Sequence, residues 1–203
     1  GIGHTVRYQG DKVIHDRPRE TYFAVFDPKT STWTPWQAMD MPKEAKFYNA
    51  GAGSVQRFDL ENGEILLPIY FKGITNKTLS STVLRCRFDG QTLRYVEHGS
   101  QHTVNIDRGL YEPSLAKFKD RFYFTMRNDR AAYVATSRDG LHFDEPRKWT
   151  FDDGADLGDL ERGACILLDQ QDGHTGLPQR RERMENLAHD QRREAEAGLV
   201  QHQ

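Results

Sequence analysis

The chain has 203 residues, with 28 Lys and Arg against 30 Asp and Glu. Its formal charge of −2 argues against nucleic-acid binding by bulk attraction, and no apolar run approaches the roughly 20 residues that span a membrane. Cys86 and Cys165 are the only cysteines, which excludes a disulfide scaffold and a four-cysteine zinc site.

Composition changes sharply after residue 151. All 22 aromatic side chains and every Lys precede this point, whereas the remaining 52 residues carry six Arg and twelve Asp and Glu. A stretch without aromatic residues cannot build the same kind of core as the part before it. We therefore expect a folded domain at 1–158 and a helical or disordered tail at 159–203. A natural polar helix and a frameshift or fusion near Gly158 both explain the change.

Before residue 158, short runs rich in β-branched and aromatic residues alternate with turn signals at roughly 8–12-residue spacing. This pattern predicts an all-β fold with no helix. Strands are expected at 21–26, 32–36, 54–58, 64–70, 80–88, 92–97, 114–118, 121–126 and 131–136. Asn62-Gly63 and Asp89-Gly90 mark hairpin turns.

A turn with a leading Phe recurs at Phe58, Phe88 and Phe118, each time between two predicted strands. A meander with a repeated turn is typical of stacked antiparallel sheets, as in a β-propeller with four-stranded blades. A β-sandwich is the alternative. Because about 150 residues hold about three blades and closure needs at least four, we expect a partial propeller.

The segment SRDGLHF at 137–143 directly follows a predicted strand. A Ser-x-Asp-Gly turn that ends in an aromatic residue resembles the Asp box, or BNR repeat, of sialidase-type propellers. The carboxylate of Asp139 can accept backbone N–H groups within such a turn. The resemblance implies a structural role, at the outer edge of a blade, for Ser137, Asp139, Gly140 and Phe143.

Further segments resemble the sialidase (neuraminidase) superfamily. These are GAGSVQ at 51–56 with GEILLPIY at 63–70, and YEPSL at 111–115 with FYFTMRN at 122–128. They follow the order of the family and, together with the Asp-box segment, cover almost half of the chain. The resemblance implies part of a six-bladed propeller from a glycoside hydrolase.

The same resemblance implies catalytic roles for Glu112 and Arg127. In the family, the Glu of this segment acts as base for a tyrosine nucleophile, and the Arg is one of three that hold the substrate carboxylate. A tyrosine hydroxyl with a pKa of about 10 is a poor nucleophile until a carboxylate takes its proton. A neutral nucleophile also avoids repulsion by an anionic sugar, and an Arg fork binds a carboxylate in a bidentate way. A structural salt bridge between neighbouring strands is the alternative interpretation.

Four residues of the matching segments are candidates for substrate binding: Gln56, Tyr70, Tyr111 and Asn128. Antiparallel pairing about a turn near residue 119 should bring Ser114 opposite Met126. Glu112 and Arg127 should then lie within about 8 Å of each other, a separation that a shared ligand or water spans. Gln56 and Tyr70 should open onto the same mouth of the propeller, with Asp139 on the far rim.

Several family positions have no counterpart in the sequence. No Arg-x-Pro strand motif precedes Gly51, and the segment RPR at 17–19 does not match it. The nucleophilic Tyr and the third Arg belong to late blades, and this chain has no Tyr after Tyr133. We therefore expect the free polypeptide to be inactive.

The first functional hypothesis is a fragment of an exo-acting, retaining sialidase-like glycosidase for anionic glycans. The second is a five-bladed glycosidase in which Glu112 is the general acid beside two Asp, and the third is a non-catalytic glycan-binding propeller. An Arg cluster around the pocket would favour the sialidase-like glycosidase. An Asp pair beside Glu112 without Arg would favour the five-bladed glycosidase, and a purely aromatic lining would favour the glycan-binding propeller. The identity of the sugar stays open.

We expect no cofactor and no metal, because His98 and His102 lack a third ligand in the sequence pattern. The acidic segment at 152–156 lacks the downstream Glu of a calcium loop. The expected partner is a glycan, the oligomeric state stays open, and we expect a secreted or periplasmic parent protein although this segment shows no signal peptide.

Overall fold

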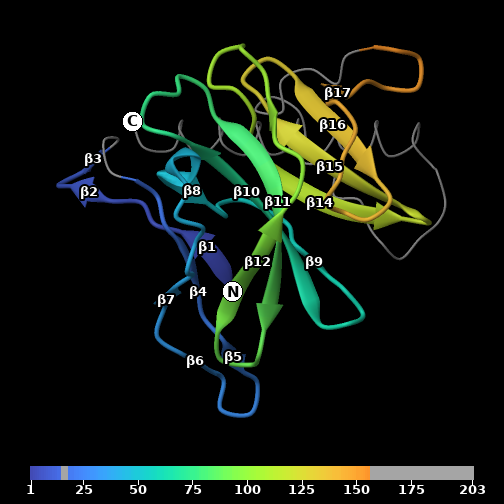
Figure 1. Cartoon of the computed structure of the whole chain (residues 1–203). Helices are drawn as coiled ribbons and strands as arrows, with labels where there is room; N and C mark the ends of the chain where they lie inside the picture. Colours follow the sequence, from blue (N-terminus) through green and yellow to red (C-terminus); the bar gives the residue numbers. More distant parts are fainter. Residues whose placement is uncertain (15–17, 156–203) are drawn as a thin grey trace, which may run out of the picture. The chain divides into compact units, whose positions relative to one another are not determined.

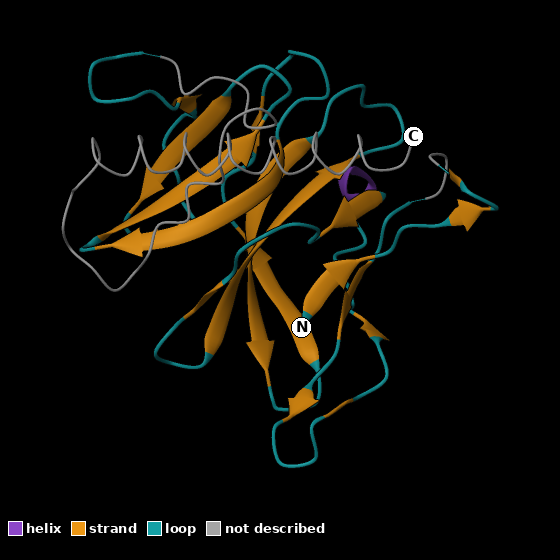
Figure 2. Cartoon of the chain, turned by 180° about the vertical axis from the view of Figure 1, so that it is seen from behind, coloured by secondary structure: helices purple, strands orange, loops and turns teal. Residues whose placement is uncertain are grey.

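The computed structural model describes residues 1–14 and 18–155, and this part of the chain is all-β (Figure 1). Its single helical element is one turn of 3-10 helix, η1 (Ala45–Phe47), which the sequence did not predict. Figure 2 shows this turn beside the strands from the opposite side. The tail predicted at 159–203 lies outside the described residues. No helix long and apolar enough to cross a membrane occurs in the described part.

Three antiparallel sheets follow one another along the chain. The first contains, in spatial order, β1 (Ile2–His4), β4 (Thr21–Phe23) and β7 (Gln37–Ala38). The second has the order β12-β11-β10-β8, from β8 (Asn49–Gly51), β10 (Glu64–Lys72), β11 (Ser80–Phe88) and β12 (Leu93–His98). The third is a four-stranded meander of β14 (Tyr111–Phe118), β15 (Arg121–Arg127), β16 (Ala132–Ser137) and β17 (Arg147–Lys148). Successive meanders of this kind form a partial β-propeller.

Short strands complete the sheets. In the second sheet, β9 (Phe58–Asp59) pairs with β10 and β13 (His102–Thr103) pairs with β11. Two hairpins stand apart: β2 (Tyr8–Gln9) with β3 (Lys12–Val13), and β5 (Phe26–Asp27) with β6 (Thr32–Trp33).

Three predicted strands are shorter than expected. The segment 21–26 splits after Phe23, because Phe26 pairs with Trp33 in a separate hairpin. The segment 32–36 shrinks to β6. In the segment 54–58 only Phe58 lies in a strand, and Ser54 has a left-handed backbone φ of 53° that interrupts the extended conformation.

The long strand β10 is buried on both of its faces because apolar clusters pack on each side. Ile65, Leu67, Ile69 and Phe71 belong to a cluster with Phe23, Met39 and Phe47 of the preceding segments. Leu66 belongs to a second cluster, which includes Leu115, Phe124 and Met126 of the third sheet. Successive side chains of a strand point to opposite faces, so a strand buried on both sides reads as a continuous apolar run.

Candidate active site

Glu112 and Arg127 meet at one end of the third sheet. Strands β14 and β15 pair antiparallel with Tyr111 opposite Arg127, so the start of one strand lies beside the end of the other. Nη1 of Arg127 donates a hydrogen bond to Oε2 of Glu112 at 2.6 Å. Both side chains are partly exposed, at 30% for Glu112 and 22% for Arg127. The short turn between the strands thus brings the two residues together, as its position predicts.

The register differs from the expected one by a single residue, because Ser114 lies opposite Thr125 and not Met126. The two-residue turn sets this register, because Phe118 pairs with Arg121 and the pairs continue without a break to Ser114. A bulge between Ser114 and Tyr111 then moves the pairing by one residue and places Tyr111 opposite Arg127, and Glu112 within the bulge has a left-handed φ of 46°. For a non-glycine residue this conformation costs about 1–2 kcal/mol. Bulges change the direction of a side chain, and backbone strain of this kind is concentrated at functional sites.

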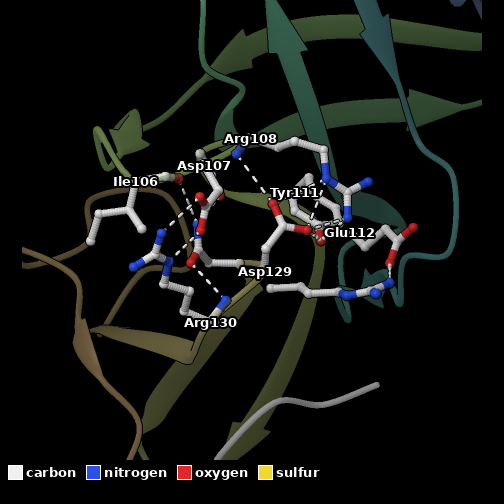
Figure 3. A network of polar contacts seen from close by, with 10 residues as sticks. Ile106, Asp107, Arg108, Tyr111, Glu112, Asp129 and Arg130 are labelled. Atoms are coloured by element: carbon white, nitrogen blue, oxygen red, sulfur yellow. Dashed lines mark hydrogen bonds and ion pairs between the residues drawn. The ribbon is translucent and has the colours of Figure 1, made fainter. Parts of the chain in front are cut away.

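Arg108, Tyr111 and Asp129 form a network beside this pair (Figure 3). Arg108 forms an ion pair with Asp129 and donates a hydrogen bond to the Tyr111 hydroxyl at 2.6 Å. That hydroxyl in turn donates to Asp129 at 2.9 Å. The Arg108 guanidinium holds the pKa of Asp129 well below its usual range, so Asp129 stays an anion.

Tyr111 is a buried wall of the site and not an open stacking surface, since only 2% of it is exposed. The guanidinium of Arg108 lies 4.4 Å from its ring centre and that of Arg127 lies 5.2 Å from it. Burial, with the hydrogen bond to Asp129, raises the pKa of Tyr111 far above its ordinary value. The phenol therefore stays neutral, and its ring packs against the guanidinium groups of Arg108 and Arg127 beside Glu112.

Tyr70 comes to the same place from the second sheet. Its ring centre lies 6.4 Å from that of Tyr111, in an edge-on arrangement. The guanidinium of Arg19 lies 5.4 Å from the Tyr70 ring, and the Tyr70 hydroxyl lies 3.5 Å from Nδ1 of His4. Burial raises the pKa of Tyr70, and the charge of Glu112 contributes to this rise.

His4 completes this side of the site. Burial, followed by the charge of Arg19, lowers the pKa of His4, while the charge of Glu112 acts in the opposite direction. The imidazole is therefore mainly neutral at pH 7. It lies where side chains on Gly51 and Gly53 would be, since a Cβ on Gly53 would lie 1.5 Å from its Nδ1 and a Cβ on Gly51 would lie 2.7 Å from its Cβ. The Gly-x-Gly segment thus makes room for His4.

Sequence reasoning missed His4, Arg19 and Arg108. No local pattern marks His4, because its place depends on the pairing of β1 with β4 and on the two glycines. Arg19 belongs to the RPR segment at 17–19, which does not match the family motif. Arg108 could have been suspected only from its position three residues before Tyr111, since a buried phenol needs a hydrogen-bond partner.

Asn128 is placed differently from the expectation, whereas substrate binding by Gln56 stays a prediction. Asn128 is only 2% exposed, and its amide donates to the carbonyls of Ile106 and Gly109. Both of its N–H donors are therefore used to hold the loop before β14, which argues against substrate binding by this amide. Gln56 is exposed and joins the third sheet through its backbone carbonyl, which accepts from Leu115 N–H at 3.0 Å.

The turn at 137–143 lies at the opposite end of the third sheet, where Ser137 pairs with Phe122. Oδ1 of Asp139 accepts the backbone N–H groups of Leu141 and His142 at 2.9 and 2.8 Å. Gly140 has a positive φ of 79°, and Phe143 packs into the second apolar cluster. These contacts stabilise a tight turn at the end of the third sheet that is remote from Glu112. Among the described residues, no group of three or more His, Cys, Asp and Glu is arranged to hold a metal ion.

No protein-family model and no curated protein matches the sequence. Similar solved structures include a Trypanosoma rangeli sialidase, at 12% identity and a TM-score of 0.49, over 78% of this chain and 28% of that one. The sialidase from the same organism in complex with sialic acid matches at 13% identity and a TM-score of 0.44, over 71% of this chain and 21% of that one. This chain spans about a quarter of the length of these sialidases, and likeness at this level carries no argument about catalysis or binding.

Proposed function

We propose that this chain supplies part of the active site of a sialidase-like glycoside hydrolase that acts on anionic glycans. The observation that carries the proposal is the Glu112–Arg127 pair at 2.6 Å, with Arg19 and Arg108 on the two tyrosine rings beside it. A partly exposed carboxylate among several guanidinium groups suits a site that binds an anion and also accepts a proton.

In this proposal Arg127 binds the carboxylate of the sugar. A guanidinium presents five N–H donors in a planar fork that matches a carboxylate, and Glu112 accepts from its Nη1. The contact to Glu112 fixes the plane of the fork in advance, so little side-chain freedom is lost when the substrate binds. A Lys at this position would present a single charged nitrogen in place of the fork.

Glu112 is the proposed base for a tyrosine nucleophile. Neither Tyr70 nor Tyr111 fits the role of nucleophile, because both are buried and both have raised pKa values. An activated nucleophile needs the opposite shift or an effective base in contact with it. The Tyr111 hydroxyl contacts Asp129, but Arg108 lowers the pKa of this carboxylate and makes it a poor base. The proposal therefore takes the nucleophile, and retaining chemistry with it, from blades that this chain does not supply, and it predicts that the free chain is inactive.

Two other functions fit less well. A five-bladed glycosidase would use Glu112 as general acid beside two Asp, but Asp129 is bound by Arg108 and Tyr111. A non-catalytic glycan-binding propeller would have an aromatic lining, whereas the residues around Glu112 include three Arg.

The test is the hydrolysis of a fluorogenic sialoside by a complete propeller that includes this chain. Glu112→Gln should lower kcat by roughly 10²–10⁴-fold, because it removes the base and keeps the shape, while the unfolding midpoint changes little. Glu61→Gln, in the exposed turn between β9 and β10, is the matched control and should leave kcat unchanged. Full turnover in the Glu112→Gln enzyme, or an equal loss in the control, contradicts the proposal.

A further inference from the structure

A hollow of about 280 Å³ lies beside the candidate site and is lined by segments that are far apart in the sequence. It contains residues from the β2–β3 hairpin and its approach, the start of β8, the end of β10 and the loop before β14. Arg19 and Arg108 line it and also lie over the rings of Tyr70 and Tyr111. The hollow therefore shares Arg19 and Arg108 with the surroundings of Tyr70 and Tyr111.

The lining of this hollow is strongly basic. It includes five cationic side chains, Arg7, Arg19, Lys72, Lys77 and Arg108, and its described residues include no carboxylate. Five like charges around one concave surface create a positive potential that concentrates anions. Most of the remaining lining is apolar, as in sites that bind organic ligands and not bare ions.

Only part of this positive charge is compensated within the described residues. Arg108 is paired with Asp129, and Arg7 lies 3.4 Å from Glu20 in an exposed pair. No described carboxylate lies within ion-pair distance of Arg19, Lys72 or Lys77. Lys72 ends β10 and Lys77 lies in the following loop, so the sheet itself holds the first of these lysines in place.

We propose that this hollow binds a second anionic group of the glycan, a sulfate, phosphate or carboxylate on the sugar next to the one held at Arg127. This inference rests on the proposed function and narrows its substrate class to glycans with anionic groups on neighbouring sugars. The first anion position is the sugar carboxylate at Arg127, and the second is the hollow. Arg19 and Arg108 lie near both positions, whereas Lys72 and Lys77 line only the hollow.

The test is calorimetric titration of this chain with N-acetylglucosamine 6-sulfate and with N-acetylglucosamine. The sulfated sugar should bind and the neutral one should not, and the affinity should fall as salt rises because the contacts are ionic. The double variant Lys72→Gln/Lys77→Gln should weaken sulfated-sugar binding roughly tenfold or more, since a hydrogen bond to a charged group contributes about a factor of ten.

The matched control is Lys29→Gln/Lys43→Gln, which removes two exposed lysines outside the hollow and should leave the affinity within about twofold. Circular dichroism checks that both double variants fold. Equal binding of the two sugars, an unchanged affinity in the Lys72/Lys77 variant, or an equal loss in the control overturns the inference.

A second variant separates this inference from the proposed function. Arg127→Lys should weaken the binding of sialic acid and leave the binding of the sulfated sugar within about twofold. If sialic acid depends on Arg127 but the sulfated sugar ignores Lys72 and Lys77, only the second anion position is wrong. If the sulfated sugar depends on the lysines but sialic acid ignores Arg127, the proposed function is wrong and the anion-binding hollow remains.

Discussion

At the scale of single residues, the site depends on space left by two glycines. A Cβ on Gly53 would lie 1.5 Å from Nδ1 of His4, and its backbone φ is not in the left-handed region. We expect Gly53→Ala to destabilise the chain by about 1–3 kcal/mol through overpacking. Chemical denaturation measures this change, and Gly3→Ala is the matched control because nothing lies within 4 Å of a Cβ there.

The clash with His4 is the specific cause of this expected loss. His4→Ala/Gly53→Ala should therefore recover at least about 1 kcal/mol relative to the sum of the two single changes, as residues in contact do. Additive effects of the two substitutions would mean that His4 does not lie against Gly53.

The Asp139–His142 contact predicts a pH dependence of stability. Nδ1 of His142 lies 2.6 Å from Oδ2 of Asp139, and this contact raises the pKa of His142 above 6.5. A group whose pKa is higher in the folded state stabilises the fold fully below its unfolded pKa and loses this effect as pH rises through its folded pKa. Stability should therefore fall as pH rises above 6.5, and the fall should be smaller in His142→Gln. Denaturation midpoints across this pH range measure it, and identical pH profiles of the two proteins would contradict it.

Asp139 makes the opposite contribution at acid pH. Burial opposes its charged form, but hydrogen bonds from His142, Leu141 and Ser137 outweigh burial and hold its pKa far below the ordinary value. Its stabilising effect is present above the unfolded pKa and disappears as pH falls towards the folded one. Asp139→Asn should accordingly flatten the acid side of the stability profile.

Local spacing predicted that Glu112 and Arg127 meet, while their role as site residues was implied only by the family resemblance. Glu112 and Arg127 flank a short turn between two recognisable strands, so their pairing could be read from spacing. His4, Arg19 and Arg108 lie on a three-residue strand or in loops, and the packing of one sheet on another brings them in. Their positions depend on contacts that no local pattern encodes. The sequence likewise did not predict that the side-chain amide of Asn128 binds two backbone carbonyls.

At the scale of elements, the bulge in β14 is the feature that places Glu112. Its φ of 46° favours glycine, so Glu112→Gly should be more stable than Glu112→Ala by about 1 kcal/mol. At Ser114, in the same strand and without a positive φ, the order should reverse. Unfolding free energies of the four variants measure both differences, and Ala more stable than Gly at both positions would show that the bulge is unstrained.

Long strands were predictable from the sequence and short ones were not. The bounds predicted for β11, 80–88, agree with the structure, and β10 extends only two residues beyond its predicted end. Strands β1, β7 and β8 have two or three residues each and pair with neighbours through backbone hydrogen bonds. Their formation depends on the sheet beside them and not on their own side chains.

At the scale of the whole molecule, aromatic side chains are exposed near the first sheet. Phe26 and Trp33 lie with ring centres 5.1 Å apart, and Trp33 and Trp36 are 56% and 58% exposed. Exposed apolar patches favour association. We expect the isolated chain to self-associate or to unfold at modest temperature, and Trp33→Ser/Trp36→Ser to associate less.

Light scattering and calorimetry over a range of protein concentrations measure this behaviour. Tyr8→Ser, which changes another exposed aromatic residue, is the control and should associate as the unchanged chain does. A concentration-independent monomer with a cooperative transition above about 65 °C, beyond the usual range of mesophile domains, would contradict this expectation.

The claim that most needs testing is that Arg127 and Glu112 form a site for a sugar carboxylate. The direct measurement is the affinity of this chain for sialic acid and for its methyl ester, which lacks the negative charge. We predict that the acid binds at least roughly tenfold more tightly than the ester, and that Arg127→Lys removes most of this preference while the fold is retained. Equal affinities for the acid and the ester, or an unchanged preference in Arg127→Lys, would leave the Glu112–Arg127 pair as a structural salt bridge only.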